Sequence, residues 1–333
     1  MGDTGWSQLT SESSERPLGA MDAARMAWRL LRSDFWRLWL LVLVVNAILF
    51  GAGLVTQCAG MVPLVGGLIS MALMMGIYVF GSPPLQAGLF YAIRRKIDGG
   101  QAKVDGLFEG FKQRYWESVV AELPFLGIWV AVWGILIVAM GVGVFVFVGA
   151  ASGDGRGPFA HGLTPAWITG IVAAGVVFLA ILAAAAIFSL FFIFALLAVW
   201  DFPGRYGRSI VTSMRLVRQH FWSVLGLVLL LWVVGLAVAI VAAIPGGVLA
   251  LAGGLAERNW KDMPMTFFVA LGAGVIIFYA LSFLAMAGVT AWYKAAVIYL
   301  YRSWTGQPLV QPAAEVAPPM PAGPQADAAP PAM

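Results

Sequence analysis

Long apolar segments alternate with short polar segments along almost the whole chain. A run of about 20 apolar residues is long enough to cross the ~30 Å hydrocarbon core of a bilayer as a helix. The pattern therefore predicts an all-α membrane protein with six transmembrane helices. The predicted spans are residues 35–57, 61–81, 121–149, 166–199, 221–244 and 266–300.

Two segments leave alternatives open. The adjacent prolines of "GSPPLQAG" (81–88) remove backbone donors and clash with the preceding turn, so we expect them to interrupt the second helix. Residues 84–96 are then a separate interfacial helix or a sharply bent continuation. The apolar, glycine-rich residues 245–254 are expected to enter the outer leaflet or to cover it.

The composition is typical of a membrane protein. Of the 333 residues, 61% are hydrophobic and 11% are charged, against about 25% charged in soluble domains. Residues 1–20 are polar and have no apolar core, which argues against a cleavable signal peptide. We expect disordered tails at 1–20 and at the Pro/Ala-rich residues 307–333, flanking a membrane domain of residues 21–306.

The distribution of positive charge predicts the orientation. Of the 20 Lys and Arg residues, all except Arg156, Arg258 and Lys261 fall on one side of the predicted spans. Because basic residues are retained on the cytoplasmic side, both termini are expected to be cytoplasmic. The expected location is a bacterial inner (plasma) membrane.

A short motif recurs where each odd-numbered span begins. It consists of a basic residue, two variable residues, an aromatic residue and Trp: Arg32, Phe35 and Trp36; Lys112, Tyr115 and Trp116; Arg218, Phe221 and Trp222. Such rings favour the headgroup level, and basic side chains extend to lipid phosphates. The recurrence predicts three repeated helical hairpins, each preceded by a cytoplasmic amphipathic interfacial helix. These helices are either topology anchors or lipid-sensing and docking elements.

No arrangement of residues predicts catalysis, a metal site or a cofactor. The chain has a single cysteine, Cys58, and two histidines, His161 and His220, that are far apart in sequence. Asp201 is interpreted as a helix terminator, together with the Pro and Gly that follow it. Lys294 lies near the end of the sixth span, where a lysine can extend to the interface.

Glu122 is the one acidic candidate for an intramembrane role. Pro124 follows it closely, and because Pro favours the first turn of a helix, we interpret Glu122 as interfacial. A proton relay at Glu122 is the alternative.

Residues 195–231 and the closing phrase "VIYLYRSWTG" (297–306) resemble a broad group of uncharacterised bacterial multi-pass membrane proteins, families of unknown function. These are similar in style to the membrane domain that precedes some glycerophosphodiester phosphodiesterases. The residues that carry the resemblance are Asp201, Ser213, Leu216, Arg218, Phe221 and Trp222. It extends over residues 21–306 and implies architecture alone, so the phosphodiesterase activity is not carried over.

The preferred hypothesis is a non-enzymatic membrane protein that serves as a membrane-embedded scaffold or accessory subunit. Its expected partners are membrane lipids with anionic headgroups, with other membrane proteins as an open alternative, and no nucleic acid. The rival hypothesis is a transporter or channel for a small molecule or lipid. Transport predicts a polar cavity at mid-membrane depth, lined by Asn46, Ser189 or Thr290.

Overall fold

A computed structural model describes residues 17–62, 65–152, 165–255 and 265–308. Within these ranges every regular element is a helix, and 6 helices are long and apolar enough to cross a membrane. The prediction of an all-helical multi-pass protein is confirmed at this level. Most of both predicted tails lies outside the described residues, as do Arg156, His161, Arg258 and Lys261.

The helices follow the predicted order with shifted ends. They are α2 (Ala20–Ser33), α3 (Phe35–Gly60), α4 (Gly66–Gly76), η1 (Ile77–Gly81), α5 (Ser82–Ile97), η2 (Val104–Phe108), α6 (Glu109–Gln113), α7 (Tyr115–Ser152), α8 (Pro165–Leu190), α9 (Ala195–Ala198), α10 (Arg208–Gln219), α11 (Phe221–Leu255) and α12 (Met265–Thr305). Several helices are longer than the apolar windows because helical structure continues into the flanking polar and glycine-containing residues.

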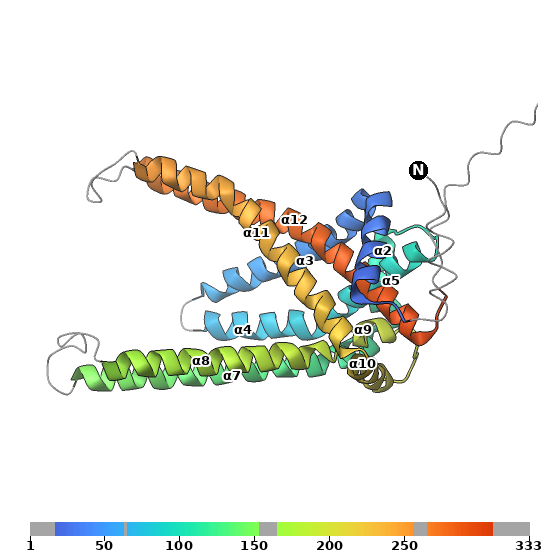
Figure 1. The fold of residues 1–333 in the computed structure, drawn as a ribbon. Helices are drawn as coiled ribbons and strands as arrows, with labels where there is room; N and C mark the ends of the chain where they lie inside the picture. The colour runs from blue at the N-terminus through green and yellow to red at the C-terminus, as the bar shows by residue number, and fades with distance from the viewer. Residues whose placement is uncertain (1–16, 63–64, 153–164, 256–264, 309–333) are drawn as a thin grey trace, which may run out of the picture.

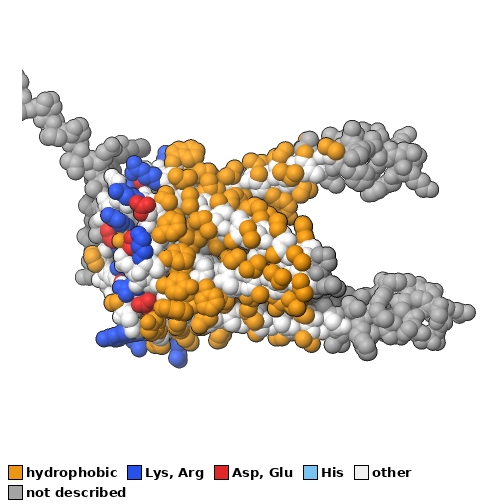
Figure 2. All heavy atoms as spheres, turned by 180° about the vertical axis from the view of Figure 1, so that it is seen from behind, with side chains coloured by type: hydrophobic (Ala, Val, Ile, Leu, Met, Phe, Trp, Pro, Cys, Tyr) orange, Lys and Arg blue, Asp and Glu red, His pale blue; other side chains and the backbone are white. Residues whose placement is uncertain are grey.

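Three helical pairs extend from one common end of the molecule, which we call the base (Figure 1). α3 packs with α4, α7 with α8, and α11 with α12, and the pairs diverge with distance from the base. The base contains α2, α5, α9 and α10 together with the adjoining ends of α3, α7, α11 and α12. Charged side chains gather at this end on the face seen in Figure 2, whereas the described surface of the pairs is largely apolar.

The hydrophobic core lies in the base. α5 contributes several side chains that are at most 2% exposed, among them Leu85, Leu89 and Ile93. In contrast, only 11% to 22% of the most apolar window of each candidate span is buried. The base therefore holds the fold together, and most of each span faces its surroundings.

Pro83 and Pro84 do not interrupt the second span, contrary to the sequence prediction. α4 continues through the π-helical turn η1 into α5, and both prolines occupy the first turn of α5. A π-helical turn shifts the hydrogen-bond register by one residue, as the N–H of Ser82 shows by donating to the carbonyl of Ile77. Residues 84–96 are thus a continuation of the span that forms the centre of the core, rather than an interfacial helix.

Two further prolines lie inside continuous helices. α11 passes through Pro245 and ends at Leu255, so residues 245–254 extend the helix instead of forming a separate segment that enters or covers the leaflet. α7 begins at Tyr115, and Pro124 lies in its interior. The expectation that Pro124 occupies the first helical turn was wrong, which places Glu122 deeper in α7 than predicted.

Two glycines allow the segment after α5 to pack directly on its backbone. A Cβ atom at Gly88 would overlap the carbonyl oxygen of Leu107 in η2, and one at Gly110 would overlap the carbonyl oxygen of Pro84. Because no larger residue fits at either position, this backbone contact fixes η2 and α6 against α5. The start of α7 is thereby held at the base.

Candidate functional site

The recurrent aromatic motif lies at three helix junctions with similar backbone geometry. α3, α7 and α11 begin at Phe35, Tyr115 and Phe221. The single residue before each of these helices has φ between −143° and −124° and ψ between 32° and 47°; these residues are Asp34, Arg114 and His220. All three junctions lie at the base, where these helices begin (Figure 1).

Side-chain packing at the junctions is also alike. Each motif aromatic ring meets the following Trp edge-on, with centroids 5.1 to 5.5 Å apart. Trp36, Trp116 and Trp222 are 72%, 57% and 79% exposed. The basic members of the motif, Arg32, Lys112 and Arg218, are exposed as well. The motif therefore places an exposed indole ring and an exposed cation at the base of each helical pair.

Asp201 is the centre of a hydrogen-bonded cluster, and not simply the terminator of a helix. One carboxylate oxygen accepts from Arg94 of α5 at 2.8 Å. The other accepts from the hydroxyl of Tyr301 at 2.6 Å and from the amide of Gln307 at 2.9 Å. Arg94 also donates to Gln307 at 3.2 Å. The cluster joins α5, the segment after α9 and the end of α12.

Other ion pairs at the base connect segments that are distant in sequence. Arg302, only 4% exposed at its side chain, lies 2.6 Å from Asp98, and Lys96 lies 2.7 Å from Asp34 at the first junction. Partly buried pairs of this kind fix the relative positions of helices, since removing one partner leaves a charge without compensation. We assign these residues a structural role.

Ser213, one of the residues that carry the family resemblance, also has a structural role. Its buried hydroxyl donates to the carbonyl of Phe191 at 2.7 Å and accepts from the N–H of Phe194 at 3.1 Å. Phe191 and Phe194 lie in the turn between α8 and α9. The hydroxyl therefore satisfies polar backbone groups in the turn that separates α8 from α9.

Glu122 and Lys294 form an electrostatic pair between α7 and α12. Their opposite charges act on each other over a longer distance than that of a salt bridge, and the Lys294 ammonium lies 4.0 Å from the centroid of the Phe90 ring. Lys294 therefore packs against Phe90 of α5, and its extension to the interface stays a prediction. Ionisable groups within membrane segments are costly and frequently functional, so this pair is a candidate site in its own right.

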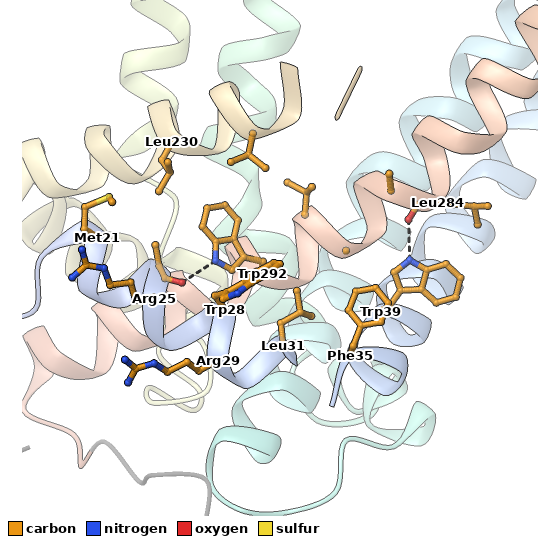
Figure 3. A pocket seen from close by; sticks show the side chains of 15 residues that line it. Met21, Arg25, Trp28, Arg29, Leu31, Phe35, Trp39, Leu230, Leu284 and Trp292 are labelled. Atoms are coloured by element: carbon orange, nitrogen blue, oxygen red, sulfur yellow. Dashed lines mark hydrogen bonds between the residues drawn. The ribbon is translucent and has the colours of Figure 1, made fainter. Parts of the chain in front are cut away.

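A groove of about 500 Å³ lies where α2, α3, α11 and α12 meet (Figure 3). Its walls are mostly apolar and aromatic, and two arginines lie at one edge. The lining residues are Met21, Ala24, Arg25, Trp28, Arg29, Leu31, Phe35, Trp39, Leu230, Val234, Leu284, Ala285, Gly288, Val289 and Trp292. A volume of this size falls within the ~300–1,000 Å³ of small-ligand sites.

The polar residues proposed for a transport cavity do not line this groove. Asn46, Ser189 and Thr290 are absent from its walls, and the hydroxyl of Ser189 donates to the carbonyl of Ala185 in its own helix. Among the described residues, no group of three or more His, Cys, Asp or Glu side chains is arranged to hold a metal ion.

His220 stacks on Trp304 at the third junction. The ring centroids are 4.2 Å apart and the planes are inclined by 15°. Partial burial lowers the pKa of His220 below its ordinary value of 6.5, because desolvation disfavours the imidazolium form. The ring therefore contributes to the contact between the α10–α11 junction and α12.

Sequence reasoning identified the junction aromatics and missed the Asp201 cluster, the partner of Glu122 and the groove. The only signal for the pair was the presence of two opposite charges, Glu122 and Lys294, in otherwise uncharged spans. Comparison with protein families matches residues 40–304 to the model described as "Domain of unknown function (DUF7847)". No curated protein and no solved structure matches the chain.

Proposed function

Since the chain belongs to this family of unknown function, with a match over most of its length, we propose that it is a non-enzymatic scaffold or accessory subunit. We place it in the bacterial inner membrane. The observation that carries the proposal is the divergence of the three helical pairs, with at most 22% of any span's most apolar window buried. Because the spans bury so little of their surface against one another, they present large apolar faces to other membrane proteins.

The proposed orientation places the base in the cytoplasm, in accordance with the excess of Lys and Arg there. The native Cys58 is exposed in α3 near the end farthest from the base. In a Cys58→Ala background, Ser152→Cys should react with a membrane-impermeant maleimide in intact cells. Thr305→Cys should react only after the cells are permeabilised. The reverse pattern would show that the orientation is inverted.

We also propose that the chain consists of three repeats, each made of an interfacial amphipathic helix, an aromatic anchor and an outward hairpin. The similar backbone angles before Phe35, Tyr115 and Phe221 support this proposal. The exposed Trp rings support a role in contact with anionic headgroups at the cytoplasmic face.

Site-specific photocrosslinking in intact membranes tests the scaffold proposal. A photoreactive phenylalanine at Trp232, which is 71% exposed on α11, should produce a discrete crosslinked protein. The same probe at Leu227, which is 1% exposed on the same helix, is the matched control and should produce none. Crosslinks to lipid alone from Trp232 and from other exposed span positions would contradict the proposal.

The Glu122–Lys294 pair favours a second candidate, a lipid-handling transporter or channel. Ionisable residues within membrane segments mark substrate and ion pathways in many membrane proteins. Proteoliposomes containing fluorescent phosphatidylglycerol would then show transbilayer lipid movement that Glu122→Gln abolishes and that Glu117→Gln, at the edge of the same helix, leaves intact. Movement no faster than in protein-free liposomes would exclude this function for phosphatidylglycerol.

A further inference from the structure

The groove between α2, α3, α11 and α12 has two ends of different chemistry (Figure 3). Arg25 and Arg29 lie at one end, and Phe35, Trp39 and Leu284 lie at the other. A ligand that lies along the groove therefore meets cations at one end and hydrocarbon at the other. This polarity suits an amphiphile rather than a uniformly polar or uniformly apolar molecule.

The interior of the groove has little to offer to a polar ligand. The indole N–H of Trp39 donates to the carbonyl of Leu284 at 2.8 Å, and that of Trp292 donates to the carbonyl of Ala24 at 2.9 Å. Two of the three indole donors in the walls are thus occupied, and they hold α3 and α2 against α12, whereas the third belongs to Trp28, which is 59% exposed. A polar group inside the groove would lose its hydrogen bonds to water without replacing them.

The arginine end can bind an anion. Arg25 and Arg29 are four residues apart on α2 and therefore lie on the same face, with Cβ atoms roughly 6 Å apart. The Arg25 side chain is 70% exposed, and its contact with Asp22 is long, at 3.8 Å. A guanidinium group binds phosphate oxygens with two parallel hydrogen bonds, so a phosphate at this end is well matched.

The space for a hydrocarbon chain depends on small residues of α12. Gly288 lies beneath the rings of Phe35 and Trp39, each of which would be 3.7 Å from an added Cβ atom. Ala285, one turn earlier, also lines the groove and is exposed. Both positions therefore add little side-chain volume to the wall of the groove.

We propose that this groove is a binding site for one anionic phospholipid, with its phosphate at Arg25 and Arg29 and an acyl chain along Trp39 and Gly288. Charge complementarity at one end and an apolar wall at the other select this occupant over a transmembrane helix of a partner, which would bury the arginines against apolar side chains. This proposal depends on the proposed orientation in one respect only: the orientation determines the leaflet from which the lipid enters the groove.

Native mass spectrometry of the full chain in mild detergent tests the proposal. The probe is dioleoylphosphatidylglycerol, compared with dioleoylphosphatidylcholine, which has the same acyl chains and no net charge. We expect a single saturable phosphatidylglycerol adduct with a Kd about tenfold lower than for phosphatidylcholine, as one charge-assisted interaction implies.

Two pairs of variants separate the site from general membrane affinity. Arg25→Ala with Arg29→Ala should weaken the adduct about tenfold or more. Arg95→Ala with Arg205→Ala, which removes the same charge from exposed positions outside the groove and outside the recurrent motif, should not. Ala285→Trp fills the groove and should abolish the adduct. Ala280→Trp, at an exposed position of α12 outside the groove, should leave it intact.

Equal binding of the two lipids would overturn the proposal, as would equal losses in the two arginine double variants. Retention of the adduct in a folded Ala285→Trp variant would do the same. These measurements need neither a protein partner nor a membrane of defined sidedness. The lipid-site proposal can therefore be refuted while the scaffold proposal stands, and the scaffold proposal can be refuted while the lipid-site proposal stands.

Discussion

Replacement of Asp201 by Asn should destabilise the base strongly although the two side chains have the same shape. Asp201 accepts hydrogen bonds on both oxygens, from Arg94, Tyr301 and Gln307. Asn has one acceptor oxygen, and its NH₂ group would face at least one of these donors. The variant also leaves the Arg94 guanidinium, 22% exposed, without its carboxylate.

The magnitude follows from these contacts. A hydrogen bond to a charged group contributes about 1.5–3 kcal/mol, and loss of a partner leaves a desolvated group unpaired. Residual exposure of Arg94 and Asp201, 22% and 16%, screens part of this effect. We expect Asp201→Asn to lower the free energy of unfolding by about 2–4 kcal/mol, which is more than a tenfold change in the unfolding equilibrium.

The assay is reversible unfolding by SDS in mixed micelles, followed by far-UV circular dichroism. Asp22→Asn is the matched control, because the Asp22–Arg25 pair is exposed and its atoms are 3.8 Å apart. This control should change the free energy of unfolding by at most about 0.5 kcal/mol. Equal effects of the two variants would refute the conclusion that the Asp201 cluster holds the base together.

Two further predictions concern the base. Because burial lowers the pKa of His220 below 6.5, the contribution of His220 to the free energy of unfolding should be constant above about pH 6.5. It should fall as the pH decreases below 6.5 and level off below the folded-state pKa. His220→Phe, which keeps a ring on Trp304, should lessen this fall in the same SDS titration, and an unchanged pH profile would contradict the assignment. Gly88→Ala should destabilise the protein by roughly 2 kcal/mol or more because its methyl group overlaps the Leu107 carbonyl. Gly127→Ala, with open space around the new methyl group, should be neutral or slightly stabilising, and similar thermal stability of the two glycine variants would contradict the packing argument.

The sequence alone determined the class of the fold and the positions of its spans. Transfer of a helix into hydrocarbon depends on the sum of local side-chain contributions, which a window of residues contains. For the same reason the starts of α3 and α11 at Phe35 and Phe221 agree with the predicted spans, whereas α7 begins at Tyr115, before the predicted residue 121. The course of the chain at Pro83–Pro84 could not, because it depends on a π-helical turn that the core around α5 accommodates.

The candidate sites were decided by tertiary structure. Asp201 accepts hydrogen bonds from Arg94 and Tyr301 across 107 and 100 residues of sequence, and the charge of Glu122 acts on Lys294 of another span. The groove combines walls from the first helices and the last two, held together by indole hydrogen bonds such as that from Trp292 to Ala24. The hydrophobic pattern of a sequence indicates which surroundings each residue prefers. The pairing of distant side chains depends instead on how the helices pack at the base.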